Sequence, residues 1–219
     1  MMPQFASEID HLVVTASSLE AGVAFVEAEL GCRMQPGGQH PQMGTHNRLL
    51  RLGTNVYLEV LAIDPTAAAP ERARWFGLDQ LTAADAPRLS AWVMRTQSIH
   101  ELAARCPEPL GAVELMRRGE LEWWITIPPD GRCVMGGAMP PLIEWRTKSP
   151  PATRLPESGI ELLELELRHH ETAQLQKWFE IAGFQGSIRL CKPLSGEEGG
   201  LGAVLRRSDG HVVRWSSAS

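Results

Sequence analysis

Three short apolar runs of the sequence each carry one side chain that could bind a metal ion or move a proton. His11 lies in Ile-Asp-His-Leu-Val-Val, Glu59 in Tyr-Leu-Glu-Val-Leu, and Glu144 in Leu-Ile-Glu-Trp. A carboxylate inside an apolar strand is costly to bury unless a cation, a donor or water accompanies it. One imidazole and two carboxylates on strands that line a cavity would suit a divalent ion such as Zn, Mn, Fe or Ni. Either glutamate could also act as a general acid or base.

Each of these residues also has an ordinary structural interpretation. Taken alone, Glu59 and Glu144 would lie on the exposed face of a half-buried strand, and His11 would be a hydrogen-bonded structural histidine. The metal interpretation depends on the equivalent places of these residues in repeated units of the chain.

A second group of polar residues follows a pair of glycines. Gly37 and Gly38 allow the backbone to turn tightly and to approach a ligand closely. The next residues offer donors, acceptors and metal ligands at one place: His40, Thr45, His46 and Asn47. We expect at least one of three residues, His40, His46 or Asn47, to contact substrate or metal. The alternative is that Thr45 and Asn47 only stabilise their own turn.

The elements that must position these residues recur three times along the chain. Each unit has a strand-like run, a capped helix and three further strand-like runs. Ser17 and Glu20 form a capping box before the first helix. Ser98 and Glu101 form another before the second helix. The sequence therefore predicts an α+β fold of repeated βαβββ modules, two of which form a cavity between concave sheets.

The predicted organisation has two complete modules and a third, degenerate one. The boundaries are 8–64 for the first module, 65–87 for a linker or insertion, 88–149 for the second module, 150–159 for a proline-rich linker, and 160–217 for the third unit. In the third unit Arg214 stands where Glu144 stands in the second. We therefore expect that unit to hold no metal and to support the fold or form a homodimer contact.

Composition excludes several classes of function. The chain has 219 residues, 43% of them hydrophobic, and a net charge of −5. No basic tract is present, so we expect no nucleic-acid partner. No apolar stretch is long enough for a membrane span, and the first ten residues lack the positive charge of a secretory signal. The four cysteines have no paired or zinc-binding spacing, which favours reduced thiols in a cytoplasmic protein.

Taken together, these motifs resemble the vicinal oxygen chelate superfamily. The resemblance is carried by the run around His11, the helix after it, and the run that contains Glu59. Within the superfamily, the Pro-Gly-Gly-Gln-His-Pro and Gly-Thr-His-Asn segments of 36–47 resemble the glyoxalase-like domain family. The similarity is strongest over 8–64 and continues more weakly to about Pro156. It implies paired βαβββ modules and, in many members, a divalent metal on the first and last strands.

The resemblance implies particular metal ligands. His11 matches the histidine of the first module, and Glu59 and Glu144 match the last-strand ligands of the two modules. The fourth position, on the first strand of the second module, falls on Ala91, which cannot bind a metal. This departure argues against glyoxalase I or extradiol dioxygenase chemistry, although His46 could replace the ligand if its loop folds over the cavity.

Tryptophan is frequent in the strand-like runs, and most of these side chains would belong to an ordinary core. One or two on a concave sheet would provide an apolar wall for a small organic ligand. Trp92 is the preferred candidate, because it stands beside Ala91.

Two functions remain open from the sequence. The first is a metal-dependent enzyme, glyoxalase-, isomerase-, lyase- or dioxygenase-like, that acts on a small molecule with two adjacent oxygens. The ion would act as a Lewis acid, and Glu59 or Glu144 would move a proton. The second is a metal-free protein that binds or sequesters small molecules, like the bleomycin-resistance members of the superfamily. The His11, Glu59 and Glu144 set favours the first function, and Ala91 favours the second.

Overall fold

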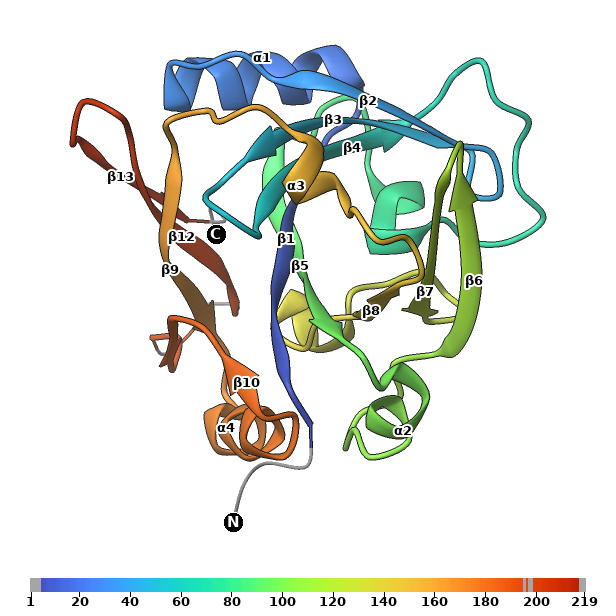
Figure 1. Ribbon diagram of the computed structural model, residues 1–219, viewed down its shortest axis with the longest axis vertical. Helices are drawn as coiled ribbons and strands as arrows, with labels where there is room; N and C mark the ends of the chain where they lie inside the picture. The colour runs from blue at the N-terminus through green and yellow to red at the C-terminus, as the bar shows by residue number, and fades with distance from the viewer. Residues whose placement is uncertain (1–4, 195, 197–198, 217–219) are drawn as a thin grey trace.

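The first part of the chain forms one βαβββ module. The computed structural model describes residues 5–194, 196 and 199–216. The elements of the module are β1 (Ser7–Thr15), α1 (Leu19–Leu30), β2 (Gln35–His40), β3 (Thr45–Arg51) and β4 (Tyr57–Ile63). Helix α1 lies along one side of the sheet, and the opposite side is open (Figure 1).

Helix α1 has a clear start and stop signal in the sequence. The Ser18 hydroxyl accepts a hydrogen bond from the Ala21 backbone N–H at 3.1 Å, which satisfies a donor that the first turn leaves free. Gly31 ends the helix in the left-handed region, with φ of 64°. The predicted capping box placed the cap at Ser17, one residue too early.

The second module repeats the first. Its elements are β5 (Arg88–Thr96), α2 (Ile99–Ala103), β6 (Ala112–Arg118), β7 (Leu121–Ile127) and β8 (Leu142–Trp145). Short helical segments lie between or after these elements: η1 (Trp75–Gln80), η2 (Val134–Gly137) and α3 (Pro151–Arg154).

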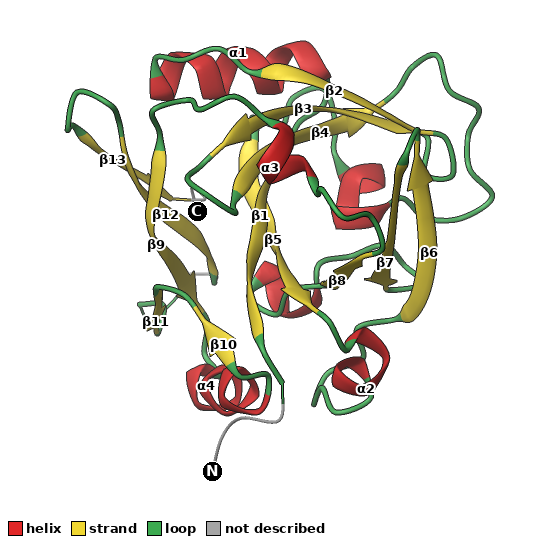
Figure 2. Cartoon of the chain, viewed as in Figure 1, coloured by secondary structure: helices red, strands yellow, loops and turns green. Residues whose placement is uncertain are grey.

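The two modules join into one curled sheet. The strand order is β2-β3-β4-β1-β5-β8-β7-β6. In each module the first strand runs parallel to the last, as in the pairs β1–β4 and β5–β8, and the antiparallel pair β1–β5 joins the modules. Figure 2 shows that the strands of the two modules curve in space and do not lie flat. The predicted α+β fold of two βαβββ modules is confirmed.

Alternate residues of this sheet belong to two different cores. On the convex face, Leu12, Leu58 and Trp92 are fully buried with the helices and the third unit. On the concave face, Val13 and Ala91 pack with the residues that surround the cavity. The face of a residue therefore decides whether it can reach a ligand.

The third unit has the predicted succession of elements but a different strand pairing. Its elements are β9 (Glu161–Arg168), α4 (Thr172–Ile181), β10 (Phe184–Gln185), β11 (Ile188–Cys191), β12 (Gly200–Arg206) and β13 (Val212–Ser216). The sheet order is β11-β9-β12-β13, so the first strand lies inside the sheet instead of at one side. Strand β10 leaves this sheet and pairs with β1. The last residue of the predicted unit, 217, lies outside the described residues.

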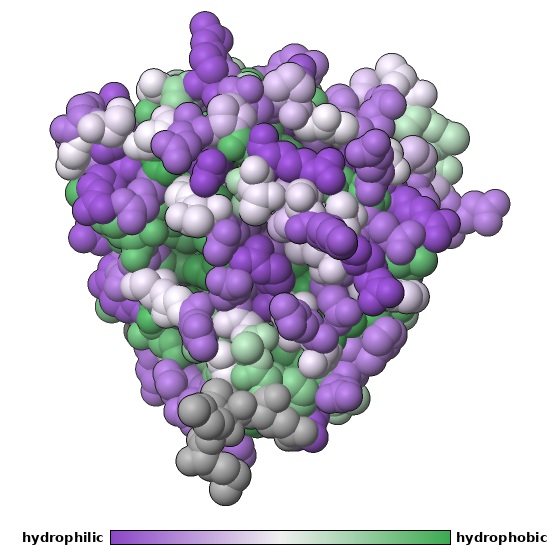
Figure 3. Space-filling view, viewed as in Figure 1, coloured by the Kyte–Doolittle hydropathy of each residue, from purple (hydrophilic) through white to green (hydrophobic). Residues whose placement is uncertain are grey.

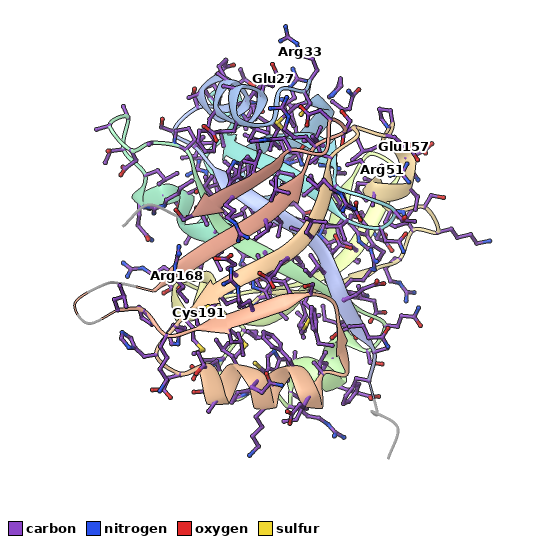
Figure 4. All side chains as sticks on the ribbon, turned by 90° about the vertical axis from the view of Figure 1, so that its left-hand side faces the viewer. Glu27, Arg33, Arg51, Glu157, Arg168 and Cys191 are labelled. Atoms are coloured by element: carbon purple, nitrogen blue, oxygen red, sulfur yellow. The ribbon has the colours of Figure 1, made fainter. Side chains whose placement is uncertain are left out.

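The third unit covers the convex face of the large sheet. Leu165, Trp178 and Leu205 share one core with residues of β1, β4 and β5. Figure 4 shows this four-stranded sheet in front of β1 and β5, with Arg168 and Cys191 at the ends of the paired strands β9 and β11. Arg214 lies far from the cavity lining and pairs with Glu166 at 3.3 Å.

The outer surface is largely polar. Hydrophilic side chains predominate on the face shown in Figure 3, with apolar side chains between them. Among the described residues, the large hydrophobic side chains that are exposed are Ile181, Leu194 and Val212. None of the helices in the described part of the chain has the length and apolar character needed to cross a bilayer.

Candidate active site

A cavity opens on the concave face of the large sheet. The centre of a water-sized molecule can occupy about 30 Å³ of it, and the total space between atoms, open solvent included, is about 350 Å³. Both modules and the η1 segment contribute to its lining: His11, His40, Tyr57, Glu59, Trp75, Phe76, Arg118, Trp123, Ile125, Ile143 and Trp145. The polar side chains come mainly from the first module, and the second module contributes mainly apolar and aromatic ones.

Asp10 and His11 form a hydrogen-bonded pair although they are consecutive residues. In a regular strand their side chains would point to opposite faces. The pairing of β1 with β5 is irregular between Ile9 and His11, as at a β-bulge. The Asp10 carboxylate consequently reaches His11 Nδ1, with 2.7 Å between Oδ1 and Nδ1. Because a carboxylate only accepts, Nδ1 carries the hydrogen and Nε2 is left to face the cavity.

The Asp10 carboxylate is completely buried and has several donors around it. Its other oxygen accepts hydrogen bonds from Arg95 and from the Trp145 indole N–H, each at 2.9 Å. Arg95 also pairs with Glu8 at 2.7 Å. These contacts satisfy a buried charge that would otherwise be costly, and they fix the acceptor that orients His11.

Glu59 lies opposite His11 in the cavity. Its Oε2 is 3.5 Å from His11 Nε2, which is longer than a usual hydrogen bond. Its other oxygen accepts a short hydrogen bond from the Asn47 side-chain amide. All three side chains are less than 10% exposed. The structure thus brings together two of the predicted site residues, His11 and Glu59, and the hydrogen bond from Asn47 fixes the Glu59 carboxylate.

The two glycines allow Asn47 to take this position. The Gly38 backbone N–H donates to Asn47 Oδ1 at 2.7 Å. A Cβ at Gly37 would overlap both the side chain and the backbone oxygen of Asn47. The close approach expected for Gly37 and Gly38 is therefore made by the Asn47 side chain, which orients Glu59 and does not itself line the cavity.

His40 and Arg118 form a second polar contact in the cavity. Arg118 donates from Nη1 to His40 Nε2 at 3.1 Å, and His40 Nδ1 lies 3.1 Å from the Thr45 hydroxyl. Burial, followed by the positive charge of Arg118, lowers the pKa of His40 well below its usual 6.5. A neutral His40 with its hydrogen on Nδ1 satisfies both contacts, and Thr45 acts as a partner of His40.

Tyr57 forms part of the cavity wall beside His11. The two rings are stacked, with 4.6 Å between their centroids. Burial, followed by the negative charges of Asp10 and Glu59, raises the pKa of Tyr57 well above 10. The phenol therefore stays neutral, and its side-chain hydrogen bond with Asp10 also favours the protonated form.

Aromatic side chains cover the rest of the cavity. Trp123 and Trp145 are neighbours across β7 and β8, with ring centroids 5.3 Å apart. Trp75 and Phe76, from η1, have centroids 5.8 Å apart. The indole N–H of Trp75 is buried and has no hydrogen-bond partner among the described residues. The wall can therefore contact a flat apolar group.

Glu144 does not join His11 and Glu59. Strand β8 directs Ile143 and Trp145 into the cavity, so Glu144 between them lies on the opposite face. Its carboxylate accepts a hydrogen bond from the Ile99 backbone N–H at 3.0 Å. The predicted metal ligand and proton carrier is thus a cap for helix α2, and the expected set of one histidine and two glutamates is not assembled.

Two predicted ligand-binding residues also lie away from the cavity. Trp92 is fully buried on the convex face, where it packs against Phe179 and Phe184. His46 alternates with Thr45 and Asn47 along β3 and is absent from the cavity lining, so it cannot supply a missing ligand there. Both corrections have the same cause, because neighbouring residues of a strand point to opposite faces.

The residues of the cavity do not fit a complete metal centre. His11 Nε2 and Glu59 Oε2 are two donor atoms from the first module. The concave positions of the second module hold Ala91, Ile143 and Trp145, which have no suitable donor. Within the described ranges, no group of three or more His, Cys, Asp or Glu side chains could hold a metal ion. Protein zinc sites use at least three protein ligands.

Sequence reasoning missed three functional candidates: Asp10, Arg118 and Trp145. Asp10 precedes His11 in the sequence, but regular alternation places it on the other face. Arg118 belongs to a strand with several exposed charges, and nothing local distinguishes it from Arg117. Trp145 could have been found by alternation, since it stands next to Glu144.

Comparisons with known proteins place these features in a family. The sequence model described as a glyoxalase-like domain matches residues 9–182. A hypothetical protein from Staphylococcus aureus has a similar structure over 95% of this chain and 98% of that chain, with a TM-score of 0.62 and 11% identity. That likeness concerns the fold.

Other structural matches cover about two thirds of this chain. A Streptomyces coelicolor methylmalonyl-CoA epimerase matches 64% of this chain and 97% of that chain, with a TM-score of 0.42 and 16% identity. A hypothetical protein from Bacillus halodurans matches 66% and 96%, with a TM-score of 0.41 and 13% identity. A search of curated proteins finds no match to the sequence.

Proposed function

We propose, from the premise that the chain belongs to the glyoxalase-like domain family of the vicinal oxygen chelate superfamily, that its cavity binds a small organic molecule and that His11 and Glu59 transfer a proton. The resemblance on which the sequence analysis rested is confirmed by the family match. The proposal rests above all on one observation, the buried alignment of Asp10, His11 and Glu59 beside an open cavity.

The geometry supports acid–base chemistry in several ways. Asp10 holds the hydrogen of His11 on Nδ1, as the aspartate of a catalytic triad does. Nε2 and Oε2 lie 3.5 Å apart at the lining of the same cavity, so both atoms can approach one C–H group of a bound substrate. Asn47 fixes Glu59, so the carboxylate loses little freedom when a substrate binds.

The simplest reaction that this pair can support moves a proton without redox change. One of the two groups removes a proton from a carbon next to a carbonyl, and the electron pair of the broken C–H bond becomes an enolate. Returning the proton to the same or the neighbouring carbon gives an exchanged, epimerised or isomerised product.

Hydrogen exchange tests this proposal directly. The protein is incubated in D₂O with a panel of 2-oxo acids and 2-hydroxy ketones, and NMR follows the loss of C–H signals. Glu59→Gln should lower the exchange rate by at least about 100-fold, which is typical for loss of a general base. Glu144→Gln, on the opposite face, is the matched control and should leave the rate unchanged.

The panel gives a definite answer about Glu59. Exchange that depends on Glu59 and not on Glu144 supports the proposal. Absence of exchange across the panel, or exchange that survives Glu59→Gln, contradicts it.

The metal-dependent enzyme predicted from the sequence remains a second candidate. One observation favours it: His11 Nε2 and Glu59 Oε2 face the same space, and substrate or water would have to provide the remaining ligands. Elemental analysis after incubation with Zn, Mn, Fe or Ni salts tests this candidate. If the protein is a metal-dependent enzyme, elemental analysis should find about one bound ion per chain. The double variant His11→Ala, Glu59→Gln should lose this ion. Uptake that survives this double variant would place the metal elsewhere.

A binding protein without chemistry is the third candidate, and it uses the same cavity. Such a protein would bind ligands without exchanging their hydrogens, in wild type and in every variant. The D₂O experiment therefore also separates this candidate from the first proposal.

Location and assembly stay predictions. None of the four cysteines forms a disulfide, and burial raises the pKa of Cys106 to about 11 and that of Cys133 to about 12. Both of these thiols therefore stay protonated at neutral pH. A homodimer through the third unit can be tested by analytical ultracentrifugation.

A further inference from the structure

We propose that the cavity selects a flat organic molecule with a single negative charge, whose carboxylate binds Arg118. This inference rests on the proposed function in one respect, namely that the ligand occupies the same cavity. It goes further because it assigns a substrate class and an anchoring residue.

Arg118 differs from the other arginines near it on the sheet. Arg72, Arg95 and Arg117 each pair with a carboxylate within 3 Å. Arg118 lines the cavity, and among the described residues its hydrogen bond goes to a histidine and to no carboxylate. A guanidinium presents two parallel donors that match a carboxylate, so a ligand of this class would complete its hydrogen bonding.

His40 positions Arg118 without neutralising its charge. The imidazole is 5% exposed, is tied to Thr45 and accepts from Nη1 of Arg118. Gly38 contributes space, because a Cβ there would lie 2.8 Å from Cδ of Arg118. The guanidinium is therefore packed and oriented, and its positive charge remains available to the cavity.

The aromatic walls determine the shape of the ligand. Trp75, Trp123 and Trp145 line the same cavity as Arg118, and large flat side chains favour a flat partner.

The remaining charge in the cavity limits the ligand to one negative group. Glu59 lines the space, and Asp10 lies directly behind His11. A second anionic group on the ligand would approach these carboxylates and be repelled, because like charges in a partly buried site are only weakly screened.

Benzoate and benzamide test the inference, since they have the same shape and differ in charge. Binding to the full chain is measured by calorimetry and by quenching of tryptophan fluorescence. Wild type should bind benzoate at least about tenfold more tightly than benzamide, the usual scale for a charge-assisted hydrogen bond. Arg118→Met should reduce benzoate affinity to that of benzamide.

Two variants keep the result interpretable. Arg117→Met removes the neighbouring charge, which pairs with Glu122 outside the cavity, and should leave benzoate binding unchanged. Arg118→Lys keeps a charge but loses the planar pair of donors, so it should retain only part of the preference, which keeps the test usable if Arg118→Met is poorly folded. Equal affinity for both probes, no binding of either at millimolar concentration, a preference that survives Arg118→Met, or one that is undiminished in Arg118→Lys overturns the inference.

Glu59→Gln separates this inference from the proposed function. Benzoate should still bind this variant at least as tightly, because a negative charge has left the cavity. Hydrogen exchange should be lost in the same variant. Charge-selective binding without exchange would refute proton transfer and leave the anion site standing, and exchange without charge selectivity would do the reverse.

Discussion

Burial of His40 should make the stability of this protein fall as the pH is lowered below 6.5. The imidazole is buried, its Nδ1 is tied to Thr45, and positive charge approaches from Arg118, His11 and His46. Together with burial, which is the largest cause, these charges lower the pKa of His40 well below 6.5. Just below pH 6.5, the unfolded chain therefore binds a proton at His40 that the folded protein does not bind.

The sign and size of the effect follow from proton linkage. Above pH 6.5 both states hold His40 neutral, and it has no effect on the free energy of unfolding. Below pH 6.5 the unfolded chain binds one more proton than the folded protein, so stability falls as the pH falls. The loss is up to about 1.4 kcal/mol for each pH unit, and it ends once the pH reaches the lowered pKa of the folded state.

Urea unfolding at several pH values between about 7.5 and 5 measures this dependence. His40→Gln keeps a donor and an acceptor but cannot titrate, so its stability should fall less steeply than that of wild type. Arg118→Met removes a cation beside His40 and should also reduce the slope. If wild type and His40→Gln lose stability in parallel across this range, His40 is not held neutral by its surroundings and the reasoning is wrong.

Three further predictions concern stability and packing, each measured by urea unfolding at neutral pH. A double-mutant cycle of Asn47→Ala and Glu59→Ala should give a coupling energy of about 1.5–3 kcal/mol, as for a hydrogen bond to a charged group, and additive effects would show that the bond contributes nothing. Gly37→Ala should destabilise by about 1–3 kcal/mol, because the new methyl overlaps Asn47, and a neutral effect would mean that the segment can shift. Trp92→Ala should cost about 3–5 kcal/mol but leave cavity binding intact, and selective loss of binding would return Trp92 to the site.

Local signals in the sequence were sufficient for most of the fold. The capped helices and the runs of apolar residues identified two βαβββ modules, and the structure confirms both. The third unit has the expected elements, but its pairing could not be foreseen. Strand β10 pairs with β1, more than 170 residues away in the chain, and no local pattern specifies such a partner.

The candidate site was harder to predict than the fold, because a shift of one residue along a strand exchanges its two faces. Aligning Glu144 with Glu59 by their similar neighbours placed both in the cavity. The register of β8 instead puts Ile143 and Trp145 there. The same error of one position moved Trp92 from the convex core into the site.

Polar networks that cross between strands were beyond local reasoning as well. Arg118 meets His40 across 78 positions of sequence. We single out Arg118 because it pairs with no carboxylate among the described residues. Such an absence can be recognised only when the positions of the neighbouring side chains are known.

Because the pairing of β1 with β5 is irregular between Ile9 and His11, the contact between Asp10 and His11 depends on the number of residues in the strand as well as on their types. Both side chains serve one face because the backbone accommodates an extra residue at that point. Deleting a single residue ahead of His11 would turn one of the two side chains away without changing the chemistry of either. A related chain could therefore have consecutive Asp and His residues without a hydrogen bond between them. Another could have the two residues apart in sequence and still form the hydrogen bond through a different backbone path.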